Sequence, residues 1–184
     1  MKQEEDESLQ IVNIVASGTL ADSIDLGILP DTLPGCTFNA KRFPGAIFRM
    51  QDPKCVALIF STGKIVLTGF HSLEDVPVGL ERFVNMSKKA GISCYPGPKV
   101  DITNIVCSYS LGYQCNLNRI VTTLQYEHVE YEPEQFPGLV YRIPDPKIVV
   151  LIFTSGNIIL TGGKNMESIK RGLIFFKEVM ETVG

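Results

Sequence analysis

The sequence predicts an α+β protein in which two tandem repeats share one antiparallel sheet with helices on one of its faces. The first observation is a near-duplication. Residues 43–69 read FPGAIFRMQDPKCVALIFSTGKIVLTG, and residues 136–162 read FPGLVYRIPDPKIVVLIFTSGNIILTG without a gap. Sixteen of the twenty-seven aligned positions are identical. The second observation is the order of patterns, since strand-like segments come first in each half and one long helical segment comes last.

Each half is predicted to open with a strand rich in β-branched residues, at 9–17 and at 99–108. One or two helical turns are expected next, at 22–33 and 116–124. Further strands follow, separated by Phe-Pro-Gly corners, by Asp-Pro-Lys turns at 52–54 and 145–147, and by glycine turns at 62–63 and 155–156. The segments 56–60 and 148–153 are apolar at nearly every position, so we expect apolar side chains on both faces of these strands.

A helix is predicted to close each half, because apolar residues recur at helical spacing. They are Leu73, Val76, Leu80 and Phe83 in the first half, and Met166, Ile169, Leu173 and Phe176 in the second. Pro77 fits this interpretation only in the first turn of its helix. We therefore place the repeats at 9–93 and 99–184, with a linker at 94–98 (CYPGP).

The composition, 45% hydrophobic and 20% charged over 184 residues, is that of an ordinary globular protein. The net charge of −3 comes from residues 1–7 (MKQEEDE), and we expect residues 1–8 to be a disordered acidic N-terminus. The rest of the chain has equal numbers of basic and acidic residues. A neutral body does not exclude nucleic-acid binding, which depends on where the basic residues lie.

No catalytic or metal-binding constellation is present in the sequence. The five cysteines form no CxxC pair and are expected to be reduced thiols in the core. No nucleophile–base pair or phosphate loop is found, so we expect neither an enzyme nor a cofactor. The absence of a signal peptide and of a long apolar run predicts a soluble intracellular protein.

The second face of the predicted sheet is apolar and therefore needs a partner. By alternation, six residues should lie on it: Val15, Leu58, Val66, Val106, Leu151 and Ile159. The alternative is that these six belong to an ordinary core. An aromatic residue directly before Pro-Gly is more typical of an exposed corner than of a core, although two buried aromatics in each half is the competing interpretation.

From residue 9 to residue 183, the chain resembles the TATA-box-binding protein family. The resemblance rests on YEPEQFPGLVYR at 131–142, and on an LIF segment and a G-x-I-[VI]-L-T-G strand in each half. It is similar to the archaeal branch, as judged by the Phe-Pro-Gly corner in both halves. The resemblance implies a saddle-shaped sheet with helices on its convex face, and a cytoplasmic protein of an archaeal cell or a nuclear one of a eukaryote. It also implies a non-enzymatic general transcription factor without cofactor. Such a factor binds and kinks the minor groove of an A/T-rich TATA element. It then recruits transcription factor B and, through it, RNA polymerase.

The resemblance also assigns roles to residues. The wedges that kink DNA would be Phe43 with Phe60 and Phe136 with Phe153, their corners stiffened by Pro44 and Pro137. Central base pairs would be bound by Asn13, Thr68, Asn104 and Thr161, whereas a strand-edge Asn bonded to backbone is the alternative. The six apolar residues of the second face would lie against the A·T minor groove, which lacks the guanine amino group.

Phosphate contacts are expected from Arg42, Arg49, Lys54, Lys64, Arg142, Lys147 and Lys164, which could otherwise be solvated surface residues. The repeats differ here, because Lys64 aligns with Asn157 and Lys164 with His71. The segment that docks transcription factor B would include Glu132, Glu134 and Gln135, with a solvated acidic loop as the alternative. A second class of function also stays open, a non-catalytic ligand- or nucleic-acid-binding accessory module built on the same duplicated half.

Overall fold

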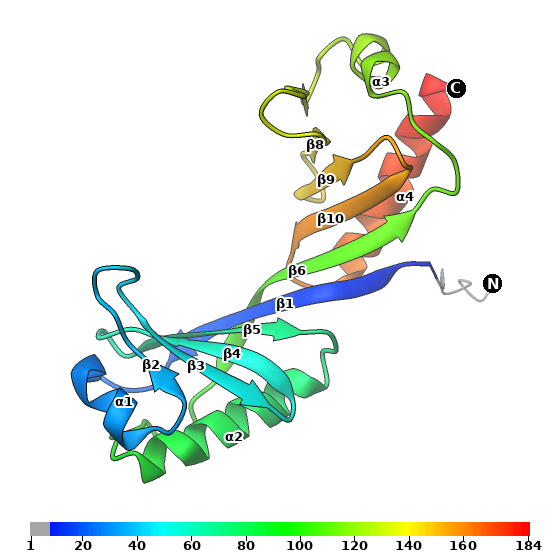
Figure 1. The fold of residues 1–184 in the computed structure, drawn as a ribbon. Coiled ribbons are helices and arrows are strands. Elements are labelled where there is room, and N and C mark those ends of the chain that lie inside the picture. Colours follow the sequence, from blue (N-terminus) through cyan, green and yellow to red (C-terminus); the bar gives the residue numbers. More distant parts are fainter. Residues whose placement is uncertain (1–7) are drawn as a thin grey trace, which may run out of the picture. The chain divides into compact units, whose positions relative to one another are not determined.

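The computed structural model describes residues 8–184, so the predicted disorder of residues 1–8 lies outside the described residues except for Ser8. Ten strands form one antiparallel sheet that is not closed, in the order β2-β3-β4-β5-β1-β6-β10-β9-β8-β7 (Figure 1). The five strands of one repeat therefore follow the same order as the five of the other, in mirror sequence. The predicted α+β class and the single antiparallel sheet are confirmed.

Each repeat runs strand, short helix, four strands and long helix. In the first, these are β1 (Gln10–Thr19), η1 (Leu26–Ile28), α1 (Leu29–Thr32), β2 (Cys36–Thr37), β3 (Ala46–Gln51), β4 (Lys54–Ile59), β5 (Lys64–Phe70) and α2 (Asp75–Lys89). In the second, they are β6 (Val100–Ser110), α3 (Leu117–Thr123), β7 (Val129–Glu130), β8 (Leu139–Ile143), β9 (Ile148–Ile152), β10 (Asn157–Gly163) and α4 (Met166–Val183).

The chain packs as two compact units whose limits differ from the sequence repeats. One unit is Asn13–Thr103, and the other is Asn104–Gly184 together with residues 8–12. We call them the 13–103 unit and the 104–184 unit. The predicted repeat limits at 9–93 and 99–184 stay a prediction. The predicted linker, residues 94–98, falls between α2 and β6.

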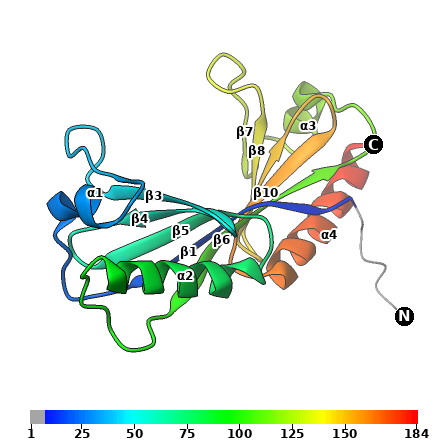
Figure 2. The ribbon, with the colours of Figure 1, turned by 60° about the horizontal axis from the view of Figure 1, so that its bottom comes forward.

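A long helix covers one face of the strands in each unit. In the 13–103 unit α2 packs on β5, and in the 104–184 unit α4 packs on β9 and β10 (Figure 2). Phe83 of α2 and Phe176 of α4 are fully buried in these two interfaces. Gly79 and Gly163 allow this close approach, because a Cβ at Gly79 would lie 2.8 Å from the ring of Phe70 and one at Gly163 would lie 2.6 Å from Ile169.

Residues that favour the start of a helix lie at the N-terminal ends of α2 and α4. Pro77 is the third residue of α2, in the first turn as the sequence required. Leu73, however, precedes α2, so its inclusion in the predicted helical stripe was wrong; it is exposed. Asn165 caps α4, its Oδ1 accepting from the Ser168 N–H at 2.8 Å. No helix among residues 8–184 is long and apolar enough to cross a membrane.

The cysteines are free thiols, as predicted. Four of them are buried, whereas Cys94 is partly exposed. Burial raises the pKa of the Cys107 thiol, which lies in β6, to about 11. Within residues 8–184, no group of His, Cys, Asp or Glu side chains is arranged to hold a metal ion.

Candidate nucleic-acid interface

Each unit has an apolar sheet face on the side opposite its helix, which we call the open face. Side chains alternate along each strand between fully buried positions under the helix and half-exposed positions on the open face. The half-exposed apolar residues include Val15, Ile47, Val56, Leu58 and Val66 in the 13–103 unit, and Val106, Val140, Val149, Leu151 and Ile159 in the 104–184 unit. All six residues predicted for this surface are among them, so they are not part of the core.

The strand register brings these side chains into rows. In the 13–103 unit one row joins Ile47, Leu58, Val66 and Ser17. The matching row of the 104–184 unit joins Val140, Leu151, Ile159 and Ser108. Four of these residues, Ile47, Val56, Val140 and Val149, were not predicted from the sequence to lie on this surface. Alternation from Leu58 and Leu151 could have found Val56 and Val149, but Ile47 and Val140 depend on the cross-strand register.

Two phenylalanine pairs stand at corners of the open faces. The rings of Phe43 and Phe60 lie 5.8 Å apart at 66°, and those of Phe136 and Phe153 lie 5.9 Å apart at 72°. Phe136 is exposed and the other three are partly exposed, so the interpretation of two buried aromatics in each half is wrong. The rings are edge-to-face pairs presented at the surface.

A buried glycine supports each pair. A Cβ at Gly45 would lie 2.8 Å from the ring of Phe43, and a Cβ at Gly138 would lie 2.7 Å from the ring of Phe136. The second Phe of each pair directly follows a strand, and its backbone N–H donates across a turn, from Phe60 to the Lys64 carbonyl at 2.9 Å and from Phe153 to the Asn157 carbonyl at 3.1 Å. The rings are thus held by short, hydrogen-bonded turns.

An asparagine and a threonine form the polar centre of each open face. Asn13 Oδ1 accepts from the backbone N–H of Gly69 at 2.8 Å, and Thr68 Oγ1 lies 3.3 Å from both its Oδ1 and its Nδ2. The ladder between β1 and β5 is irregular at Ile14 and Val15, and Gly69 has φ +95°. The Asn side chain therefore replaces a ladder partner at a β-bulge.

The same arrangement recurs in the 104–184 unit. Asn104 Oδ1 accepts from the Gly162 N–H at 2.7 Å, and Thr161 Oγ1 lies 3.1 Å from its Nδ2. Gly162 has φ +97° beside the irregularity between Leu160 and Gly163. The alternative prediction, an Asn side chain bonded to backbone, is thus correct for the Oδ1 atoms of both asparagines. The backbone donor also fixes the amide orientation, because Oδ1 must face the glycine N–H. The Nδ2 group therefore faces the open side. Of its two hydrogens, one is directed at the Thr161 hydroxyl, the one partner that Nδ2 has among residues 8–184.

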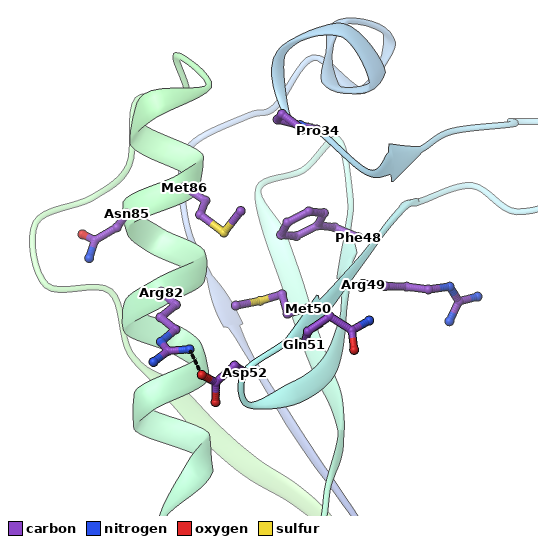
Figure 3. A pocket seen from close by; sticks show the side chains of 9 residues that line it. All are labelled: Pro34, Phe48, Arg49, Met50, Gln51, Asp52, Arg82, Asn85 and Met86. Atoms are coloured by element: carbon purple, nitrogen blue, oxygen red, sulfur yellow. Dashed lines mark ion pairs between the residues drawn. The ribbon is translucent and has the colours of Figure 1, made fainter.

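The predicted basic residues are all exposed. Arg49 and Arg142 lie opposite Val56 and Val149 in the ladders, on open-face positions. Figure 3 shows Arg49 pointing away from α2, whereas its neighbours Phe48 and Met50 point toward that helix. Arg142 also forms an exposed ion pair with Glu130 at 3.7 Å, an acid that the sequence analysis did not consider.

The remaining basic residues have different settings. Lys54 and Lys64 begin β4 and β5, Lys147 directly precedes β9, and Arg42 lies in the corner before Phe43. Lys164 lies between β10 and α4, and no ladder register places it on the open face. The corner residues Glu132, Glu134 and Gln135 are exposed. Neither of the two glutamates forms an ion pair within the described chain.

A cavity of about 450 Å³ lies between α2 and β3 of the 13–103 unit (Figure 3). Phe48, Met50 and Met86 line it, and Arg82 pairs with Asp52 at 3.3 Å across its rim. Of the residues predicted to contact DNA, Arg49 lines it, whereas none of those predicted to bind the base pairs does.

Comparison with known proteins agrees over nearly the whole chain. A family model described as "Transcription factor TFIID (or TATA-binding protein, TBP)" matches residues 8–90 and 99–183. A TATA-box-binding protein of Archaeoglobus fulgidus is 42% identical over 180 residues, which is 98% of each chain. TATA-box-binding protein 2 of Haloferax volcanii is 44% identical over 178 residues, 97% of this chain and 96% of its own. The solved structure titled "Methanococcus jannaschii TBP" is 41% identical, with a TM-score of 0.79 and coverage of 96% and 98%.

Proposed function

The chain belongs to the TATA-box-binding protein family, a family of transcription factors and not of enzymes, and from this membership we propose that it binds the minor groove of an A/T-rich promoter element through its open faces. The two relatives described above are archaeal. We expect the protein to act on the chromosome of an archaeal cell, as an initiation factor without a cofactor.

The observation that carries this proposal is the orientation of Asn13 and Asn104. Each uses Oδ1 for a glycine N–H of its own unit and one Nδ2 hydrogen for a threonine hydroxyl, which leaves the second Nδ2 hydrogen for a ligand on the open face. The minor groove of A·T pairs presents only acceptors, whereas a G·C pair adds the guanine amino donor. Amide donors among apolar side chains therefore complement A·T pairs, and a guanine amino group would lose a hydrogen bond there at about 1–3 kcal/mol.

The phenylalanine pairs support the kinking step of the proposal. Apolar wedges inserted between base steps unstack them, and the bent duplex then contacts more protein surface. Phe43 with Phe60 and Phe136 with Phe153 have the partial exposure and the rigid turns that such wedges require. The exposed basic residues of both units would bind the flanking phosphates.

For the partners, we propose that Glu132, Glu134 and Gln135 dock transcription factor B, which brings RNA polymerase to the promoter. The two carboxylates are exposed and have no basic partner within residues 8–184. Free acidic groups at a corner favour a basic partner surface.

The minor-groove proposal is tested with three duplexes of one length. One contains a TATA element, one has its A·T pairs replaced by G·C, and one has them replaced by inosine·cytosine, which has the major groove of G·C but lacks the minor-groove amino group. Gel-shift titration at fixed salt should give similar affinities for the first and third, and a loss of at least about tenfold for G·C. Equal binding of the G·C duplex, or an inosine duplex that behaves like G·C, would contradict the proposal.

A further inference from the structure

The two corners that present the phenylalanine pairs have the same backbone but opposite charge. We infer that they engage DNA in a fixed order, in which Lys41 and Arg42 bring the Phe43–Phe60 wedge to the phosphates first, and Glu132 and Glu134 delay the Phe136–Phe153 wedge. This inference rests on the proposed binding of A/T-rich DNA. It adds Lys41 as a DNA contact and the acidic pair as residues that set the order of engagement.

The backbone equivalence is close. In the first corner the Asn39 carbonyl accepts from the Arg42 N–H at 3.0 Å and from the Phe43 N–H at 3.1 Å. In the second, the Glu132 carbonyl accepts from the Gln135 N–H and the Phe136 N–H, both at 3.0 Å. The ring pairs differ by only 0.1 Å in separation, 5.8 Å against 5.9 Å. Differences in wedge behaviour therefore come from side-chain charge and not from corner geometry.

The charges of the corners are opposite at aligned positions. Lys41 aligns with Glu134, Arg42 with Gln135, and Asn39 with Glu132. The first corner thus has two basic residues and no acid, whereas the second has two acids and no base. All of these side chains are exposed. Gln135 is neutral, so a contact between it and a partner would leave this difference in charge unchanged.

The rest of each open-face rim follows the same trend. Lys64 aligns with Asn157, and Thr37 with Glu130, which pairs with Arg142 at 3.7 Å. Arg49, the counterpart of Arg142, has no ion pair within the described chain. Seven aligned pairs make up the corner and the rim, and the residues of the first repeat at these pairs are Thr37, Asn39, Lys41, Arg42, Arg49, Lys54 and Lys64. Five of these seven are basic and none is acidic. The aligned residues of the second repeat include two basic residues, Arg142 and Lys147, and three acids, Glu130, Glu132 and Glu134.

This difference acts on the approach of DNA. A basic surface attracts phosphates at long range and raises the association rate, and this attraction weakens as salt increases. Carboxylates repel phosphates over a Debye length of about 10 Å at 0.1 M salt. The first corner is therefore attracted to the duplex before any base step is opened. The second must bring two carboxylates close to the backbone as its wedge enters, which slows that step.

Exchange of the aligned residues tests the charge assignment. K41E/R42Q gives the first corner the residues of the second, and E134K/Q135R does the reverse. Each neutralised phosphate contributes about 0.9 to the slope of log affinity against log salt. We expect K41E/R42Q to reduce the steepness of this slope by about 1.8, and E134K/Q135R to increase it by about the same amount. K88E/K89Q, which makes the same charge change at exposed residues near the end of α2, should leave the slope unchanged.

The order itself is followed by stopped-flow fluorescence of a TATA duplex with 2-aminopurine, which brightens on unstacking, at both ends of the element. The wild-type chain should give a fast phase and a slow phase. Phe43→Ala should remove the fast phase, and Phe136→Ala should remove only the slow one. E134K/Q135R should accelerate the slow phase at least about tenfold, because a basic surface raises the rate at which phosphates approach.

A fast phase that disappears with Phe136→Ala, or salt slopes that the two exchanges leave unchanged, would overturn the inference while the duplex is still bound. Failure of the proposed function looks different, because A·T and inosine duplexes would then bind no better than G·C. Circular dichroism of each variant identifies any loss of folding, since the exchanged residues are exposed and none is in the core.

Discussion

Asn13 and Asn104 combine a structural and a recognition role in one side chain. The sequence marks both as polar residues within apolar strands, and it places them at equivalent points of the two repeats. It does not show the β-bulge, because a bulge depends on how β1 and β6 pair with strands far along the chain. The structure adds the glycine N–H that each Oδ1 accepts and thereby the direction of the Nδ2 donors.

Replacement of both asparagines by aspartate separates the two roles. Asp keeps an oxygen for the glycine N–H but has no amide donor, and it places negative charge opposite base acceptors. We expect folding to persist while affinity for a TATA duplex falls at least about tenfold per site, as for a lost hydrogen bond of about 1.4 kcal/mol. Fluorescence anisotropy measures the affinity and thermal denaturation measures the folding.

The matched control is Asn13→Ala, which leaves the Gly69 N–H without its acceptor. It should lower the free energy of unfolding by about 1–3 kcal/mol, the cost of an unsatisfied partly buried group. Unchanged DNA affinity in the aspartate variant would show that the Nδ2 donors do not contact the base pairs.

The cysteines allow a second prediction at the residue scale. Thiolates are the reactive form, and burial both shields four of the thiols and raises the pKa of Cys107 to about 11. A disulfide reagent at pH 8 should therefore modify Cys94 rapidly and the other four only after denaturation. Mass spectrometry of native and urea-unfolded protein gives the count, and rapid native labelling of Cys107 would contradict its burial.

At the scale of elements, the corner before β3 and the corner before β8 present their rings by the same device. A turn fixes the first ring, a buried glycine leaves space beneath the pair, and the turn after β4 or β9 fixes the second ring. The Phe-Pro-Gly motif predicted the corner from sequence. The two rings of each pair are seventeen residues apart in the sequence, and their contact depends on the hairpin register, which the motif alone does not determine.

Removal of the Phe136–Phe153 pair tests the wedge role. Phe136→Ala with Phe153→Ala should reduce DNA bending, measured by energy transfer between the ends of a labelled duplex, while the free energy of unfolding changes little because both rings are partly exposed. Phe176→Ala is the control, since its fully buried ring should cost about 3–5 kcal/mol of stability. Bending that survives the double substitution would rule out wedging at this corner.

Other elements show the limits of periodicity. Both long helices and the main strands were predicted, because their apolar patterns are long and regular. The two-residue strands β2 and β7 were missed, since so short a segment has no period. Leu73 has the right spacing for α2 but precedes it, because the helix begins only at Asp75. The position of an apolar residue in a series does not by itself locate the helix start.

At the scale of the whole molecule, the duplication predicted one shared antiparallel sheet and the equivalence of the two open faces, whereas the strand order comes from the structure. It also identified most of the apolar and aromatic residues on them. The sequence does not show whether residues that differ between the repeats lie in the same backbone conformation. The aligned corners answer this, because nearly identical turns hold Lys41 and Arg42 in one repeat and Glu134 and Gln135 in the other. An average net charge near zero for the body of the chain hides this polarity.

The same polarity should direct partner recruitment. Charge reversal of Glu132 and Glu134 to lysine removes the acidic surface that we propose for transcription factor B, and it adds attraction for phosphates. We therefore expect the variant to retain TATA binding, while the ternary complex with transcription factor B weakens at least about tenfold, as when a complementary charge contact becomes repulsive. Gel shift with and without transcription factor B measures both steps on one duplex. Lys41→Glu with Arg42→Glu is the counterpart, since it should weaken DNA binding and leave the affinity of transcription factor B for the preformed complex unchanged. A ternary complex that forms equally well with the lysine variant would place the docking surface elsewhere on the chain.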